Sequence, residues 1–140
     1  MMKALTLSAL AALSLGASAS TAFAGDAAAG EGLWRNCRSC HSITAPDGTV
    51  IQRGGRTGPN LYGLEGRAVG SQDGFRYSQL MQDYAATGAV WTEDLFTQYV
   101  ADPNAFLHAQ LGIDSGRAGM NFRLASGAED MWAYLESVSN

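Results

Sequence analysis

The chain has 140 residues, the size of a single domain, and 46% of them are hydrophobic. Nine basic and thirteen acidic side chains give it a formal net charge of −4. This balance argues against nucleic acid as a partner, because binding to phosphates calls for a basic face. Beyond the amino-terminal segment, no apolar run reaches the length of about 20 residues that spans a bilayer.

Residues 1–24 have the features of a secretory signal peptide. A short basic start, Met1-Met2-Lys3, precedes an apolar run of mostly small residues from 4 to 19. Ala22-Phe23-Ala24 then supplies the small-x-small pattern that signal peptidase cleaves. An uncleaved membrane anchor fits less well, because the run is short and rich in Ala and Ser. We predict cleavage after Ala24, export to the bacterial periplasm, and a soluble mature domain of residues 25–140 without a membrane span.

The first half of the mature domain is predicted to be one helix followed by a long loop. Asp26 is expected to cap a helix that runs to about residue 38. Residues 42–74 are dense in Gly, Thr, Ser and Pro, which is loop composition. A loop this long fits a small domain if it wraps a ligand. No alternating run predicts a strand.

The second half is predicted to be helical. A short helix is expected over residues 77–86, and Thr92 is expected to cap a helix that stops before Pro103. One or two further turns are expected over residues 104–111. Ser126-Gly127-Ala128-Glu129 predicts a capping box that opens a final helix, whose apolar residues recur at helical spacing. The prediction is therefore an all-α domain of three to five helices.

Cys37-Arg38-Ser39-Cys40-His41 is the strongest chemical signal in the chain. C-x-x-C-H is the haem-attachment motif. Two thiols three positions apart can add to two vinyl groups on one edge of a porphyrin, and the following His can then present a ring nitrogen to the iron. Half a zinc site is disfavoured because four ligands are needed and only His108 remains, and a dithiol redox pair would need a βαβ setting. We predict one haem c, bound covalently through Cys37 and Cys40, with His41 as an axial ligand.

The iron then needs a sixth ligand or an open position. Soft Met sulfur opposite His raises the reduction potential and suits electron transfer. Met81 and Met131 lie in predicted helices, where packing is the simpler role. Met120 lies in a Gly-flanked loop that can approach a haem face closely. We predict Met120 as the ligand. His108 is the alternative with a nitrogen ligand, but we expect it to lie at the surface or to contact the ligands without binding the iron.

These motifs, in this order, resemble the class I c-type cytochromes, the branch that contains mitochondrial cytochrome c and its bacterial relatives. The resemblance covers nearly all of the mature chain. It is carried by residues 25–30, Trp34, the C-x-x-C-H motif, residues 57–61, 63–67 and 74–77, Trp91, Tyr99, Asp102-Pro103, residues 120–122 and residues 130–135. It implies a single small cytochrome c domain whose helices wrap one covalently bound haem.

The resemblance also implies roles for individual residues. Pro59 is expected to offer its backbone carbonyl to the second ring nitrogen of His41, which sets the tautomer and basicity of that ligand. Gly30 is expected to allow a close crossing of the first and last helices. The remaining expected roles concern the haem edges: Arg67, Tyr77 and Trp91 around the propionates, and Tyr99 near the Met120 sulfur.

Two features depart from the family pattern. Residues 104–119 form a longer segment than in the mitochondrial form, and Ala118-Gly119 stands where Thr-Lys is usual, so the hydrogen bond of that Thr is absent. The mature chain also keeps eight Arg and no Lys, whereas the familiar members dock to acidic partners through Lys. We therefore expect a partner with a basic or fairly neutral face, or one engaged through Arg and apolar contacts.

The leading hypothesis is a monomeric, periplasmic monohaem electron carrier that is not an enzyme. Its expected partners are redox proteins of a respiratory or photosynthetic chain, such as a membrane cytochrome complex, dehydrogenase, oxidase, reductase or reaction centre.

The alternative is a gas-binding or sensing haem protein with a labile distal ligand. Relatives of that kind usually have four long helices and carry the haem motif near the carboxyl terminus of the chain. Here the motif lies near the amino terminus. A peroxidase-like enzyme is not supported, because the chain has no second haem motif and no candidate for a distal acid–base residue other than His108.

Overall fold

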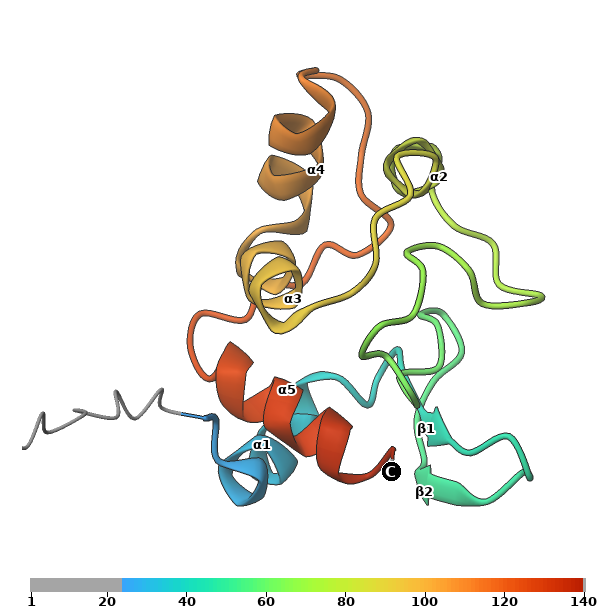
Figure 1. Ribbon diagram of the computed structural model, residues 1–140, viewed down its shortest axis with the longest axis vertical. Coiled ribbons are helices and arrows are strands. Elements are labelled where there is room, and N and C mark those ends of the chain that lie inside the picture. The colour runs from blue at the N-terminus through green and yellow to red at the C-terminus, as the bar shows by residue number, and fades with distance from the viewer. Residues whose placement is uncertain (1–23, 140) are drawn as a thin grey trace, which may run out of the picture.

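The computed structural model describes residues 24–139, so the predicted signal peptide lies almost wholly outside the described residues. Five α-helices and one turn of 3-10 helix make up most of the regular structure (Figure 1): α1 (Ala27–Leu33), η1 (Trp34–Asn36), α2 (Gln79–Ala85), α3 (Glu93–Ala101), α4 (Pro103–Leu111) and α5 (Ala128–Ser137). The prediction of three to five helices in one small domain is confirmed. None of the helices within residues 24–139 has the length and apolar character that crossing a membrane requires.

The first helix begins at the predicted cap. Asp26 Oδ1 accepts hydrogen bonds from the backbone amides of Ala28 at 2.9 Å and Ala29 at 3.2 Å. The α-helix ends at Leu33, earlier than predicted, and tightens into η1. The backbone then makes one more helical turn, in which the amide of His41 donates to the carbonyl of Cys37 at 2.9 Å. This turn sets the two cysteines and His41 on a short rigid segment.

Side-chain caps also start the three middle helices. Ser78 caps α2, Thr92 caps α3, and Asp102 caps α4 through the amide of Ala105 at 3.0 Å. These starts agree with the predictions to within two residues. Helix α4 begins at Pro103 rather than at residue 104, because a Pro at the first helical position loses no hydrogen bond.

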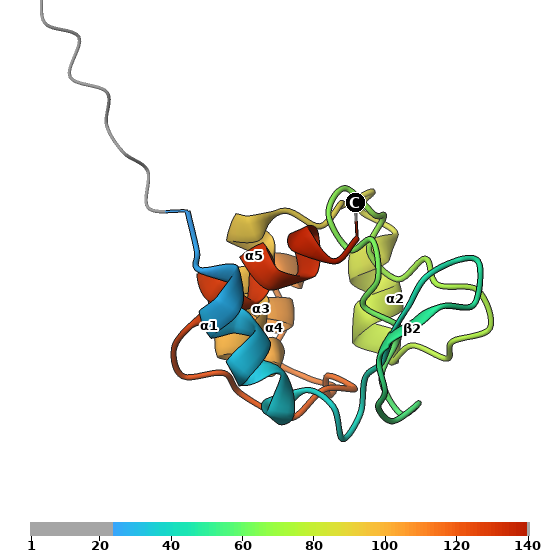
Figure 2. The ribbon, with the colours of Figure 1, turned by 90° about the horizontal axis from the view of Figure 1, so that it is seen from below.

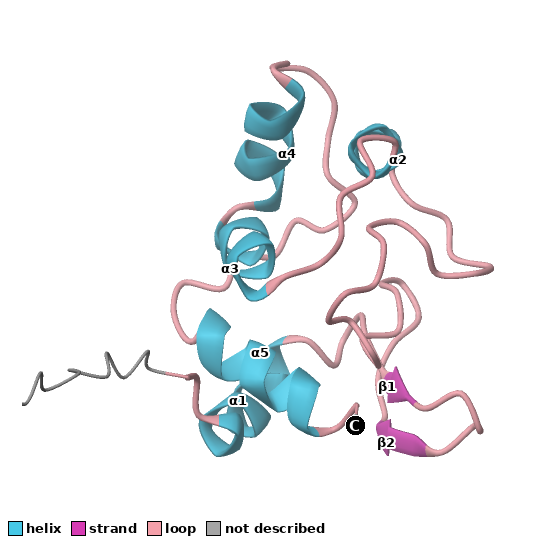
Figure 3. Cartoon of the chain, in the orientation of Figure 1, coloured by secondary structure: helices cyan, strands magenta, loops and turns pink. Residues whose placement is uncertain are grey.

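A two-stranded antiparallel sheet interrupts the predicted loop. Strands β1 (Ile43–Thr44) and β2 (Val50–Gln52) pair at the edge of a domain otherwise built of helices and loops (Figure 3). The prediction of no strand is wrong here, since two and three residues are too few to show an alternating pattern. Gln52 Nε2 donates to the hydroxyl of Tyr134 at 2.7 Å, which ties the sheet to α5.

The capping box predicted for the final helix is also wrong. Gly127, with φ of +81°, is the residue before α5, and no side chain caps the helix there. A Cβ at Gly127 would overlap the side chain of Leu33 in α1. The close approach of the two helices therefore determines how α5 begins, and the Ser126 hydroxyl does not.

Helices α1 and α5 cross in close contact (Figure 2). Gly30 is buried at the crossing, where a Cβ would overlap the backbone carbonyl of Asp130. Asp130 Oδ1 also accepts the backbone amide of Asp26 at 2.8 Å. On its other side α5 buries Met131 and Trp132, and the Trp132 ring lies 5.4 Å from that of Phe96 in α3. In this helical frame of α1, α3 and α5, the last two helices form one side of a cavity.

Candidate haem site

A cavity of about 820 Å³ lies between the helical frame and the long loop. Ligand pockets commonly fall between roughly 300 and 1,000 Å³. Its lining is mainly apolar and includes no Asp or Glu among the described residues. The lining brings together all nine residues predicted for the site: Cys37, Cys40, His41, Pro59, Arg67, Tyr77, Trp91, Tyr99 and Met120.

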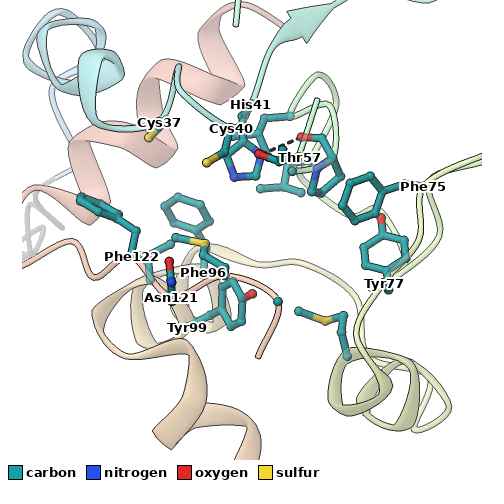
Figure 4. Close-up of a pocket in the computed structure, with 18 of the residues that line it drawn as sticks. Cys37, Cys40, His41, Thr57, Phe75, Tyr77, Phe96, Tyr99, Asn121 and Phe122 are labelled. Carbon is teal, nitrogen blue, oxygen red and sulfur yellow. Dashed lines mark hydrogen bonds between the residues drawn. The ribbon is translucent and has the colours of Figure 1, made fainter. Parts of the chain in front are cut away.

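The ring of His41 is held in one tautomer. Its Nδ1 lies 2.7 Å from the carbonyl oxygen of Pro59 (Figure 4). A carbonyl only accepts, so Nδ1 carries the proton and Nε2 keeps its lone pair. Burial lowers the pKa of His41, and the bond to Pro59 opposes that effect in part. A neutral imidazole with a free Nε2 is the form that ligates a metal.

The two thiols lie at one end of the cavity beside His41 (Figure 4). No disulfide joins them. Burial, with a smaller effect of Cys40, raises the pKa of Cys37 to about 11. Cys40 is exposed, and hydrogen bonds from the side chains of Thr57 and Ser39 lower its pKa. Because no disulfide joins them, both sulfurs can attach covalently to a group that occupies the cavity.

The loop around Pro59 contains functional residues that the sequence analysis missed. A Cβ at Gly58 would overlap the ring of His41, and one at Gly54 would overlap its carbonyl oxygen. These glycines let the loop approach the C-x-x-C-H turn closely, as a backbone without side chains can. Thr57 was missed as a partner of Cys40. The available signal was the glycine-rich stretch itself, which in sequence indicates only a loop.

Arg67 and Trp91 come together at another part of the cavity through backbone pairing. The amide of Trp91 donates to the carbonyl of Arg67, and the amide of Gly66 donates to the carbonyl of Trp91, both at 2.9 Å. The Arg67 guanidinium donates to the carbonyls of Asn60 at 3.0 Å and Tyr62 at 3.2 Å. Burial lowers its pKa, and no carboxylate of the described residues pairs with it. A half-buried cation facing a cavity suits a ligand that brings its own acidic groups.

The wall across the cavity from His41 carries Asn121, Phe122 and Tyr99 (Figure 4). Met120, next to Asn121 in the chain, also lines the cavity. Burial raises the pKa of Tyr99 to about 12, and its ring lies edge-on to that of Trp91 at 5.3 Å. The phenol therefore stays protonated and can donate a hydrogen bond at any physiological pH.

The other ligand candidates are placed differently. Met81 in α2 and Met131 in α5 also line the cavity, with 6% and 1% of their surface exposed. Both lie on helices, whereas Met120 lies on an irregular segment. His108 does not line the cavity, and its Nε2–H donates to the carbonyl of Gly116 at 3.1 Å. The cavity lining alone thus leaves three methionine sulfurs within the site and places the second histidine outside it.

A large flat macrocycle fits this set of residues. The mainly apolar lining suits its faces, the thiols lie at one end, and Arg67 offers a cation to acidic substituents. The neutral His41 offers a nitrogen to a central metal.

Comparison with known proteins agrees with this arrangement, although no family model matches the chain. The chain is 49% identical to cytochrome c2 of Rhodobacter capsulatus over 134 residues, and this match covers 96% of each of the two chains. It is 42% identical to cytochrome c-550 of Paracoccus pantotrophus over 117 residues, or 82% of this chain and 87% of the relative. The solved structure of the Rhodobacter capsulatus cytochrome c2 matches with a TM-score of 0.80 at 48% identity, over 83% of this chain and 100% of that one.

The chain belongs to the class I c-type cytochromes. The resemblance seen in the sequence is therefore confirmed. As a member of this family, the cytochrome carries one covalently attached haem c and functions as an electron carrier. When bound, the haem supplies a one-electron iron couple, and the protein supplies binding, orientation and electrostatics. In this cytochrome the mainly apolar lining would shield most of a bound haem from water, and the bond from His41 to Pro59 keeps a proton on Nδ1.

Proposed function

We propose that thioether bonds from Cys37 and Cys40 hold the haem, and that His41 Nε2 and the Met120 sulfur are the axial ligands. The observation that carries this proposal is the 2.7 Å hydrogen bond from His41 Nδ1 to the Pro59 carbonyl, because it leaves Nε2 as the free nitrogen. Pairing His with Met raises the reduction potential relative to two nitrogen ligands. A filled coordination sphere suits reversible electron transfer.

The remaining site residues would tune the haem rather than react with it. Arg67, Tyr77 and Trp91 would neutralise or hydrogen-bond the propionates, and the Tyr99 hydroxyl would lie near the Met120 sulfur. The Arg67 guanidinium supports the first role: no carboxylate of the described residues pairs with it, and a half-buried cation is stabilised by an anionic group. With both axial positions occupied, no position remains for a substrate, so the cytochrome would not be an enzyme.

We also propose that the cytochrome is exported, cleaved after Ala24 and active as a soluble monomer in the periplasm. Produced with its leader in a bacterium that matures c-type cytochromes, it is expected in the periplasmic fraction as residues 25–140 plus one haem. Intact mass and a pyridine haemochrome spectrum measure both quantities. The Cys37→Ser/Cys40→Ser double variant is the control and should lose its haem on acid–acetone extraction. A colourless secreted wild-type protein would refute the attachment through these cysteines.

Exposed Arg residues in the cavity lining or next to it in the chain support docking through this face. Arg76 lines the cavity, Arg38 lies between the two cysteines, and Arg56 precedes Thr57. All three are exposed, as is Phe122 at 42%. Six of the thirteen acidic residues lie on α1, α3 and α5, and no acidic residue of the described part of the chain lines the cavity. Of the partner types expected from the sequence, this arrangement favours one engaged through Arg and apolar contacts.

Removing two of these charges is expected to slow electron transfer to an anionic oxidant. For Arg38→Gln/Arg56→Gln, the rate of oxidation by hexacyanoferrate(III) at low salt should fall roughly three- to tenfold, because each exposed charge contributes up to about 1 kcal/mol. The difference should vanish at high salt as screening sets in. Stopped-flow absorbance measures the rate. The control, Ala28→Glu/Ala29→Glu, makes the same change in net charge on α1, and equal slowing there would rule out a localised docking face.

A further inference from the structure

The segment that carries Met120 has no helix or strand of its own. It leaves α4 through Gly112, whose φ is +66°, and turns back alongside that helix before reaching α5 (Figure 1). Its position therefore depends on contacts with neighbouring elements.

One contact reaches this segment from the first turn of α4, just before the proposed ligand. Asn104 Oδ1 accepts the backbone amide of Ala118 at 2.8 Å. Asn104 is half-buried, and Ala118 packs against the hydrophobic core. The acceptor is itself held firmly, because Asp102 caps α4 at the amide of Ala105. Ala118 has no polar side chain, so only its backbone can form hydrogen bonds. Its amide is the backbone group that Asn104 binds.

Further contacts hold the segment on both sides of Met120. Upstream, His108 donates to the carbonyl of Gly116 at 3.1 Å. Downstream, Arg123 pairs with Asp102 at 2.8 Å, and the amide of Leu124 donates to the carbonyl of Val100 at 2.8 Å. The Arg123 side chain is 66% exposed, so its ion pair contributes little. The bond to Asn104 is the partly buried side-chain contact nearest to Met120.

We propose that Asn104 is a positioning residue that keeps Met120 directed at the haem iron. The proposal rests on the proposed function, namely on Met120 being the axial ligand. Asn104 acts through Ala118: the hydrogen bond restrains the backbone two residues before Met120 and so opposes the opening of the segment. Without it, the segment leaves the iron more often, and an external ligand competes more effectively.

Asn104→Ala is expected to increase the affinity of the ferric cytochrome for cyanide by roughly three- to tenfold, the factor that one net hydrogen bond supplies to an opening equilibrium. The amide of Ala118 should exchange with solvent faster by a similar factor in the holoprotein. Asn104→Asp keeps an acceptor at the same place and should restore both values toward the wild type. Gln110→Ala, at an exposed position of α4, is the matched control and should change neither.

The outcomes separate this proposal from the one on which it rests. If Asn104→Ala speeds exchange at Ala118 but leaves cyanide affinity at the wild-type value, the contact is merely structural and the proposal is overturned. Failure of Asn104→Asp to rescue either value would also overturn it. If Met120→Ala binds cyanide no more tightly than the wild type, then Met120 is not the ligand and the proposed axial pair itself fails.

Discussion

Met120→Ala is expected to abolish the weak sulfur-to-iron absorption band near the red end of the visible spectrum and to lower the reduction potential. Loss of a soft sulfur ligand removes its preference for ferrous iron. The fall should be on the order of 0.2 V, a fraction of the roughly 0.8 V range that axial ligands set. The vacated position should also let the ferrous variant bind carbon monoxide rapidly at neutral pH. Visible spectroscopy, a redox titration and a carbon monoxide titration measure these effects.

Two matched controls follow from the three methionines that line the cavity. Met81→Leu and Met131→Leu replace the other methionines with apolar side chains of similar volume, so they should keep the band and bind carbon monoxide no faster than the wild type. His108→Ala should likewise keep the band, because His108 lies outside the cavity. A band that survives Met120→Ala and disappears in one of the controls would assign the ligand to that residue instead. Rapid stoichiometric binding of carbon monoxide by the wild type would favour the gas-binding alternative.

Gly30→Ala is expected to destabilise the holoprotein by about 2–3 kcal/mol. The new Cβ would overlap the backbone carbonyl of Asp130 and crowd Tyr134, so α1 and α5 would have to separate. Overpacking of a closed interface typically costs about 1–3 kcal/mol, and a backbone obstacle yields less readily than a side chain. For a domain of this size the melting temperature should fall by roughly 10 °C. Thermal unfolding followed by circular dichroism measures it.

Gly32→Ala is the matched control in the same helix. A Cβ at Gly32 meets nothing within 4 Å, so the change only removes backbone freedom from the unfolded chain. We expect it to stabilise the cytochrome by roughly 0.5–1 kcal/mol, the usual cost of Gly relative to Ala inside a helix. Equal melting temperatures for the two variants would contradict the close crossing of α1 and α5.

Local signals predicted the helices well because caps and helical spacing act within a few residues. The predicted caps Asp26 and Thr92 each bond to an amide two or three positions ahead in the chain, as do Ser78 and Asp102, which were not predicted as caps. Predictions failed where a distant segment decided the outcome. The start of α5 depends on its contact with Leu33, and the short sheet is anchored through Gln52 to Tyr134, 82 positions away.

The candidate site divides in the same way. The spacing of Cys37, Cys40 and His41 could be interpreted directly, because attachment to one porphyrin edge depends on local geometry. Pro59, Arg67, Tyr77, Trp91 and Tyr99 could be named only through the family resemblance. Gly58 belongs to the stretch that carries the resemblance, but its contact with the His41 ring could not be predicted, and Asn104 was not found at all, since contacts across a loop leave no sequence pattern.

The sequence by itself determined the covalent chemistry and the helical framework, since both depend on residues within a few positions of one another. Only the tertiary structure decided which tautomer His41 adopts, through a carbonyl 18 positions away, and which residue binds the backbone amide of Ala118, namely Asn104. It also brought Arg67 and Arg76 to a cavity that no acidic side chain of the described residues lines. The physical reason is that hydrogen bonds and close packing act over a few ångströms, and only the folded chain brings these distant residues within that range.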